Sequence, residues 1–439
     1  MKGISLTLAL TAFALSAAAE EYPISCWTFM TAERQRPVET VVKEWKDLGL
    51  THPMSPILGV RSGEHERIRR MLDLCEKEGL KLIVHDERAH FNCAGNVLKD
   101  DASYRRNVIA ARDEWAAHPA FAGFHLLDEP GAEHIATACA AARIMQELVP
   151  GKMCFLNLLP WYGWIGPRMG TDAYAPYLDR VAKDSGLPML CYDCYDHMTE
   201  GIADGEGLDL YFNNLREWRE FTVRNPGRSF WVTELCINHA SRVVTAQADY
   251  RWQISTAAAM GAKGIIWYYP DYCPRPSESL GNCENSPINI FGERTEFFDW
   301  LSVENRKFRH QYGSEFMRFS PEGAFMVGAS HGGVKAFAGD RDVLAVDSGK
   351  TRALVSFFHD ADGVRYLALV NLERRNTSLV HLGFDGGVVP TQRSWYQTYE
   401  PRKPAADPVL AKRSGKEGAS KLSVYLSAGQ LALFRLGRK

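Results

Sequence analysis

The segment 121–130, with the sequence FAGFHLLDEP, decides the fold class of this chain. It is a mostly apolar run of strand length that ends in the carboxylates Asp128 and Glu129. A second apolar run, 229–235 with the sequence SFWVTEL, carries Glu234 near its end. Short apolar runs of this kind are typical of parallel strands that are buried on both faces. We therefore expect each run to be a buried strand that ends in a carboxylate.

Around these two runs, short apolar segments alternate with longer amphipathic segments from residue 22 to about residue 309. The expected strands are 22–29, 51–58, 80–87, 121–128, 152–159, 188–195, 229–235 and 264–269. The clearest expected helices are 37–48, 64–78, 104–116, 133–148, 208–223, 245–260 and 295–309. Strands that are each followed by a helix predict an α/β fold, a (β/α)8 TIM barrel. The alternative is a doubly wound open sheet, which calls for a Gly-rich phosphate turn that this sequence lacks.

After about residue 315 the pattern changes to short alternating strands joined by Gly and Asp turns. These strands are 353–360, 364–372, 378–384, 394–400, 421–426 and 430–436. The alternation predicts a small antiparallel β-sandwich. We divide the chain into a barrel over residues 20–314 and a sandwich over 315–439. The sandwich is expected to pack against the barrel, with sugar binding as the alternative role.

The first residues have the pattern of a secretory signal peptide. Lys2 is followed by an apolar stretch over residues 4–15 and then by Ala17-Ala18-Ala19, a small-residue cleavage site. The apolar stretch is too short to span a bilayer. We expect residues 1–19 to be removed after Ala19 and the protein to be secreted or periplasmic.

Composition narrows the choice of partners. The formal net charge is -2, with no charged tail, which argues against nucleic acid and anionic membrane surfaces as partners. The chain has 10 Cys, most of them on expected helices or strands, where buried free thiols are the simplest interpretation. Cys273 and Cys283 bracket a loop and could close it as a disulfide. Oligomeric state cannot be read from the sequence.

The chemistry follows from where the carboxylates lie. Barrel enzymes carry their reactive groups at the carboxyl ends of the strands. Glu129 ends the fourth expected strand and Glu234 lies near the end of the seventh. A pair of carboxylates at such ends is the minimum apparatus for hydrolysing a glycosidic bond. The alternative is that both are structural charges.

These residues resemble a known group of enzymes. Glu129-Pro130 after the fourth strand, Glu234 in WVTEL and Trp267 in IIWYY resemble the clan A retaining glycoside hydrolases over about residues 22–310. The resemblance implies that Glu129 is the acid/base and that Glu234 is the nucleophile, forming a covalent glycosyl-enzyme on β-glycosides. It also implies that Trp267 floors the sugar site. The two carboxyl groups should then lie about 5–5.5 Å apart.

One position departs from that pattern. The clan usually has Asn before the acid/base, whereas this chain has Asp128. An Asp-Glu pair on the fourth strand also resembles the substrate-assisted N-acetylhexosaminidases, in which the Asp orients the acetamido group of the substrate. That alternative requires no protein nucleophile and leaves Glu234 unexplained, so it ranks second.

Other strand ends and loops supply candidate substrate contacts. We expect substrate-binding roles for Asp128, Asn157, Tyr192, Tyr195, Trp267, Trp161 and His85. Tyr192 or Tyr195 of the sixth expected strand could hold Glu234 in position. The alternative is that these tyrosines only pack in the core. Aromatic residues of the loop 161–164 could serve as sugar platforms or as a hydrophobic plug. His85 lies in a charged run that could instead form a salt-bridge network.

Two further classes of function are alternatives to a glycoside hydrolase. A metal-dependent barrel hydrolase would require a His-x-His on the first strand, and the segment 22–29 contains no His. We therefore expect no cofactor and no metal site. A non-catalytic carbohydrate-binding barrel would bind sugar without turnover, and a structural protein would lack a site at the strand ends. The expected partner is a carbohydrate substrate.

Overall fold

The computed structural model describes residues 21–28, 36–199, 206–271, 284–392, 409–410 and 419–438. Three predictions lie outside these residues: the signal peptide 1–19, the strand 394–400 and the disulfide between Cys273 and Cys283. The cysteines that the structure does describe are all free thiols, and most of them are buried.

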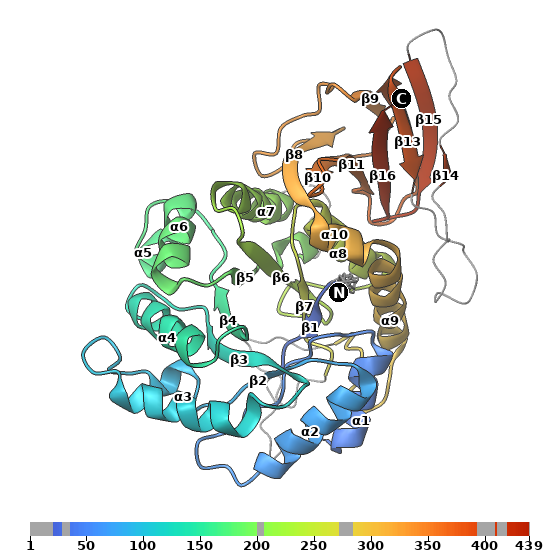
Figure 1. Ribbon diagram of the computed structural model, residues 1–439. Helices are drawn as coiled ribbons and strands as arrows, with labels where there is room; N and C mark the ends of the chain where they lie inside the picture. The colour runs from blue at the N-terminus through green and yellow to red at the C-terminus, as the bar shows by residue number, and fades with distance from the viewer. Residues whose placement is uncertain are drawn as a thin grey trace, which may run out of the picture.

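In the described part of the chain, seven parallel strands form one curled sheet in the order β1-β7-β6-β5-β4-β3-β2 (Figure 1). They are β1 (Ile24–Cys26), β2 (Leu82–Val84), β3 (Phe121–Asp128), β4 (Met153–Leu158), β5 (Met189–Asp193), β6 (Ser229–Leu235) and β7 (Ile265–Tyr268). The predicted α/β barrel is confirmed, and the runs 121–128 and 229–235 are strands over the whole of their predicted lengths.

The predicted strand 51–58 closes the barrel between β1 and β2 as an irregular segment. Thr51 N donates to Ile24 O at 2.8 Å on one side, and Ser55 N donates to Ile83 O at 2.8 Å on the other. This segment contains Pro53 and Pro56, which have no N–H to donate. The ladder is therefore interrupted, although the segment still occupies its position in the barrel wall.

Helices cover the outside of the barrel (Figure 1). They are α1 (Val38–Asp47), α2 (His65–Glu78), α3 (Ala102–Trp115), α4 (Ile135–Leu148), α5 (Gly166–Met169), α6 (Tyr174–Ser185), α7 (Glu206–Arg224), α8 (Gln247–Ala259), α9 (Glu296–Phe308) and α10 (Ser314–Arg318). The predicted helices agree with these bounds to within about two residues. In α2, Ile68, Met71, Leu72 and Cys75 share the buried face, which is the spacing of an amphipathic helix.

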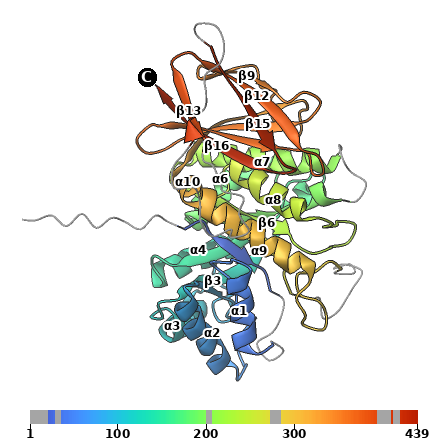
Figure 2. The same ribbon diagram turned by 90° about the vertical axis from the view of Figure 1, so that its right-hand side faces the viewer.

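After α10 the chain forms two antiparallel sheets that lie above the barrel in Figure 2. Among the described residues, one sheet has the order β14-β13-β16-β11-β10-β8 and the other the order β15-β12-β9. The strands are β8 (Ser320–Val327), β9 (Val343–Asp347), β10 (Ala353–His359), β11 (Arg365–Asn371), β12 (Ser378–Asp385), β13 (Val388–Gln392), β14 (Val409–Leu410), β15 (Ala419–Leu426) and β16 (Leu431–Arg438).

The larger sheet packs on the barrel through one face and on the smaller sheet through the other. On β10, Val355 and Phe357 belong to the core between the two sheets. Leu354 and Phe358, at the alternate positions, join the core of the barrel. The sandwich therefore packs against the barrel, as expected. No helix among the described residues is both long and apolar enough to cross a membrane.

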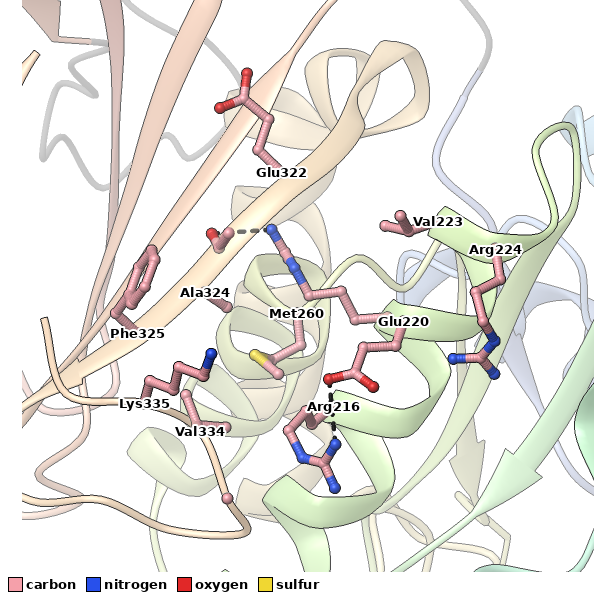
Figure 3. Close-up of a pocket in the computed structure, with 13 residues that line it drawn as sticks. Arg216, Glu220, Val223, Arg224, Met260, Glu322, Ala324, Phe325, Val334 and Lys335 are labelled. Atoms are coloured by element: carbon pink, nitrogen blue, oxygen red, sulfur yellow. Dashed lines mark hydrogen bonds and ion pairs between the residues drawn. The ribbon is translucent and has the colours of Figure 1, made fainter. Parts of the chain in front are cut away.

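Arg219 of α7 ties the barrel to the sandwich. Its side chain is buried, and it donates to the carbonyl oxygens of Ala259, Gly323 and Phe357 at 3.0–3.1 Å. Burial lowers the pKa of Arg219 to about 9. A cavity of about 430 Å³ opens beside it, between α7 and β8 (Figure 3). In that view Glu220 of α7 and Glu322 of β8 lie on opposite sides of the cavity.

Replacing this guanidinium should weaken the attachment of the sandwich. We expect Arg219→Met to lower the free energy of unfolding by about 2–4 kcal/mol, because buried carbonyl oxygens lose their donors. Urea denaturation checks this. The control is Arg224→Met, which removes an exposed ion pair with Asp179 and should cost less than about 1 kcal/mol. Equal losses of unfolding free energy in the two variants would contradict the role of Arg219 in attaching the sandwich to the barrel.

Candidate active site

A β-bulge in β3 turns Asp128 toward the inside of the barrel. In the pairing of β3 with β4, His125 lies opposite Phe155 and Asp128 lies opposite Asn157, with a register shift between His125 and Leu127. Without that shift, side chains three positions apart would point to opposite faces. The bulge therefore allows both His125 and Asp128 to face inward at the carboxyl end of the strand.

Asn157 of β4 joins two of the carboxylates. Its Nδ2 donates to Asp128 Oδ1 at 2.9 Å and to Asp193 Oδ1 at 3.0 Å. Asp193 is the last residue of β5 and also hydrogen-bonds with the side chain of Tyr195. Three adjacent strands thus contribute side chains to one point at the mouth of the barrel.

Glu129 completes this group in an unusual backbone conformation. Its φ is 44°, in the left-handed region that side chains other than Gly rarely adopt. Its N–H donates to Asn157 O at 2.9 Å, which holds the turn in register. The carboxyl group hydrogen-bonds with Asp193, and one oxygen lies 3.5 Å from Arg168 Nη2 of α5. We call Asp128, Glu129 and Asp193 the acid cluster.

The electrostatics of the acid cluster favour a neutral carboxylic acid. Burial, and then the charge of Asp128, raise the pKa of Glu129 to about 7, although Arg168 and Asp193 act in the opposite direction. Burial, followed by the charges of Glu129 and Asp128, also raises the pKa of Asp193 well above its ordinary value. Two carboxyl groups that hydrogen-bond to each other share at least one proton. The cluster can therefore hold a proton near neutral pH.

The acid cluster is accessible to a substrate. Asp128 is exposed, and the side chain of Glu129 is 31% exposed. Burial raises the pKa of Asp128, whereas the hydrogen bond that it accepts from the Asn157 amide and the charge of Arg168 act in the opposite direction. A protonated carboxyl beside an anchored carboxylate is suited to donating a proton and stabilising an adjacent positive charge.

Glu234 does not join this group, and the expectation that it faces Glu129 across the barrel mouth is wrong. On β6, the Trp231 ring lies 6.0 Å from the His52 ring inside the barrel, whereas Phe230 packs 5.6 Å from Trp218 of α7. Strand alternation puts Glu234 on the same outer face as Phe230.

The contacts of Glu234 agree with this position. It is 0% exposed, and its Oε1 accepts a hydrogen bond from Tyr211 of α7 at 2.7 Å. Its Oε2 lies 3.4 Å from His197 Nε2. Burial raises the pKa of Glu234 well above its ordinary value. The side chain is a buried acid between β6 and the helices.

Trp267 and Tyr192 are also outside the site, for the same reason. Trp267 Nε1 donates to Asn305 Oδ1 of α9 at 2.9 Å, so its ring lies between the barrel wall and the helices. Tyr192 stacks on Trp218 of α7 with ring centroids 5.0 Å apart. Neither side chain reaches the barrel mouth, and the expected sugar-binding positions of both are wrong.

The other predicted residues divide between two regions. Tyr195 interacts with Asp193 of the acid cluster, and its substrate-binding role stays a prediction. Trp161 stacks on Tyr174 at 5.7 Å, and its backbone N–H donates to Asn214 Oδ1, so it anchors its loop to the helices.

His85 stacks with two further imidazoles inside the barrel. Its ring centroid lies 4.2 Å from that of His125 and 5.2 Å from that of His90. One ring nitrogen from each of these three residues lies within 4.8 Å of the other two. The ring planes are close to parallel, and the Asn92 N–H donates to His90 Nδ1 at 3.1 Å. The neighbouring Asp86 instead pairs with Arg88 at 2.6 Å, as expected for a salt-bridge network.

Sequence reasoning missed Asp193 and Arg168. Asp193 was visible as the last polar residue of a strand, two positions after Cys191, and inward residues on a strand recur every second position. Arg168 had no such signal, because it lies on α5 and comes near Glu129 only in the folded chain, where the Arg168 carbonyl also accepts from Ala132 N–H at 2.8 Å.

Known proteins match this chain in structure rather than in sequence. No protein-family model and no curated protein matches it. A family 5 glycoside hydrolase from Bacteroides vulgatus has a TM-score of 0.57 at 9% identity, over 95% of this chain and 89% of that chain. A family 42 β-galactosidase from G. stearothermophilus has a TM-score of 0.58 at 8% identity, over 95% of this chain and 98% of that chain.

A β-galactosidase from Bacillus circulans sp. alkalophilus has a TM-score of 0.55 at 8% identity, over 95% of this chain and 99% of that chain. The chain has the fold of barrel glycoside hydrolases. At these identities the likeness is one of fold.

Proposed function

We propose that this chain is a glycoside hydrolase that uses Asp128 and Glu129 on β-linked N-acetylhexosaminides. The observation that carries the proposal is a pair of neighbouring carboxyl groups at one strand end, both with a raised pKa but with different hydrogen-bond partners. Asp128 is exposed and accepts a hydrogen bond from Asn157, whereas Glu129 has a pKa raised to about 7. The fold shared with glycoside hydrolases supports the class of reaction.

In the proposed first step, Glu129 donates its proton to the glycosidic oxygen as the bond to the anomeric carbon breaks. The acetamido oxygen of the substrate attacks that carbon and forms a cyclic oxazolinium ion. Asp128 accepts a hydrogen bond from the acetamido N–H and stabilises the positive charge. The leaving alcohol carries the proton away.

In the second step, Glu129 is a carboxylate and removes a proton from water as the water attacks the anomeric carbon. The oxazolinium ring opens, which restores the acetamido group. The product retains the configuration of the anomeric carbon. The protein supplies no nucleophile in this route. It therefore fits a site in which Glu234 is buried on the outer face of β6.

Substrate comparison tests the proposal directly. We expect measurable hydrolysis of aryl N-acetyl-β-glucosaminides or N-acetyl-β-galactosaminides and no more than trace hydrolysis of the matching aryl β-glucosides and β-galactosides. A thiazoline analogue of the cyclic intermediate should inhibit competitively. Hydrolysis that is equally fast without the acetamido group would overturn the substrate-assisted route.

The variant Glu234→Gln separates this route from a covalent one. We expect kcat to change by less than about 3-fold, because a buried outward side chain is removed from the reaction. Gln can still accept a hydrogen bond from Tyr211 and has no charge to desolvate. Burial raises the pKa of Glu234, so folding favours its neutral form and its contribution to stability decreases as pH rises.

The melting temperature of Glu234→Gln at neutral pH should therefore not fall below that of the wild type. Steady-state kinetics measure the change in kcat, and thermal denaturation measures the melting temperature. A folded Glu234→Gln variant with a loss of 10³-fold or more would restore the covalent mechanism.

We also propose that the protein is exported. The basis is the sequence of residues 1–19, with its apolar core and its Ala-x-Ala cleavage pattern. Expression in a secreting host should yield a mature chain that begins at Glu20, as mass spectrometry of the intact protein would show. Retention of Met1–Ala19 on a protein kept in the cytoplasm would contradict this.

A further inference from the structure

An exposed tryptophan lies on the loop between β4 and α5, after the strand whose Asn157 donates to two residues of the acid cluster. Trp164 is 75% exposed, whereas most other tryptophans of the described residues are buried in the core. An isolated exposed apolar side chain requires no explanation by itself. Its neighbours, however, hold it in a fixed orientation.

Tyr162 stacks beneath this tryptophan. The two ring centroids are 5.6 Å apart and the planes differ by only 7°. Tyr162 also donates its hydroxyl proton to Asp196 Oδ2 at 2.7 Å, and Asp196 Oδ1 lies 2.8 Å from Arg242 Nη2. Because Tyr162 is anchored by its hydroxyl and packs against the hydrophobic core, it supports one face of Trp164, while the exposure of Trp164 leaves the other ring face open.

Two connections join this pair of rings to the acid cluster. Asp196, which orients Tyr162, follows Tyr195 directly, and Tyr195 hydrogen-bonds with Asp193 of the acid cluster. On the other side of the loop, Arg168 lies only four positions after Trp164 and pairs with Glu129 at 3.5 Å. The platform and the catalytic carboxyls are therefore held by the same strand end and the same loop.

We propose that Trp164, supported by Tyr162, is a stacking platform for a sugar ring remote from the bond that is cleaved. This inference rests on the proposed function and names its substrate class: chains of β-linked N-acetylhexosamine units longer than a disaccharide. Pyranose rings present flat faces of C–H groups, which pack on an aromatic face. A disaccharide or an aryl glycoside would occupy only the subsites beside Glu129.

The platform makes the enzyme prefer long chains. We expect Trp164→Ala to lower kcat/KM on an N-acetylglucosamine hexamer by about 10-fold, as lost aromatic packing implies. Its kcat/KM on an aryl N-acetylglucosaminide should change by less than about 2-fold. Trp164→Phe keeps a ring and should recover most of the loss. The control is Tyr425→Ala, an exposed aromatic residue on β15 of the sandwich, which should leave both substrates unaffected.

Binding to an inactive enzyme keeps this test separate from the test of the proposed function. In a Glu129→Gln background, isothermal titration calorimetry should show tighter binding of the hexamer than of the dimer, and Trp164→Ala should remove that difference. If kcat/KM falls equally on short and long substrates, or does not fall on either, the platform is overturned. If Glu129→Gln leaves turnover intact while the chain-length effect persists, the proposed function fails and the platform remains.

Discussion

Glu129→Gln should give the largest loss of activity of any single substitution in this chain. Gln cannot donate a proton to the glycosidic oxygen, and general acid catalysis contributes about 10²–10⁴-fold to such reactions. We expect kcat on a disaccharide of N-acetylglucosamine to fall by that amount. The loss should be much smaller on a dinitrophenyl glycoside, whose leaving group departs without protonation. Steady-state kinetics on the two substrates measure the difference.

The pH profile gives a second measure of the same residue. The pKa of Glu129 is raised to about 7, so the carboxyl is protonated below that pH and ionised above it. The wild-type kcat/KM on the disaccharide should therefore decrease as pH rises through about 7. In Glu129→Gln this decrease should disappear. The control is Glu133→Gln, an exposed neighbour that pairs with His134 and should keep the wild-type profile. An unchanged profile in Glu129→Gln would assign the acid to another group.

Asp128→Asn is expected to give the second largest loss. Asn at this position can still accept a hydrogen bond from Asn157, so the geometry should survive while the negative charge is lost. Removing one electrostatic contact to a developing charge typically costs about 10²–10³-fold in kcat. The loss should apply to N-acetylhexosaminides, because the carboxylate acts on the acetamido group and its positive charge.

The same variant should also move the pH profile. The charge of Asp128 is one of the causes that raise the pKa of Glu129. Without that charge Glu129 ionises at lower pH, so the decrease in kcat/KM should begin below its wild-type position. The exposed Asp113, which pairs with Arg112, provides the matched control Asp113→Asn. A shift toward higher pH in Asp128→Asn would contradict the electrostatic arrangement.

Trp164 is expected to affect the length of substrate that the enzyme prefers. The carboxyl groups determine which bond breaks, and the platform is expected to determine how long a substrate is preferred. For this reason the Glu129 variant is compared on activated and unactivated glycosides, whereas the Trp164 variant is compared on short and long substrates. Loss of Glu129 affects every unactivated glycoside, whereas loss of Trp164 should affect long chains alone.

The sequence was sufficient for the fold because the barrel depends on local patterns. Apolar runs such as 121–128 and amphipathic runs such as 64–78 each fix one element through burial and periodicity. The strand 51–58 shows the limit of this reasoning. Its apolar content identified its position in the wall, and its two prolines made it irregular.

The site could be predicted only in part. Asp128, Glu129 and Asn157 lie together as the sequence indicated, because they are polar residues at or beside the ends of buried strands, and their roles stay predictions. Glu234 and Trp267 satisfy the same rule and still point outward. Strands of a parallel barrel are buried on both faces, one against the barrel interior and the other against helices. Hydrophobicity therefore does not indicate which face a given residue occupies.

What the sequence by itself determined is the order of strands and helices, the sandwich that follows them and the strand end that carries Asp128 and Glu129. Burial and chain periodicity act locally, so they can be read from the residues. Only the tertiary structure decided which side chains meet at the barrel mouth. The bulge in β3 turned Asp128 inward, β5 brought Asp193 beside Glu129, and α5 added Arg168. These contacts depend on register and on distant segments, which no local pattern encodes.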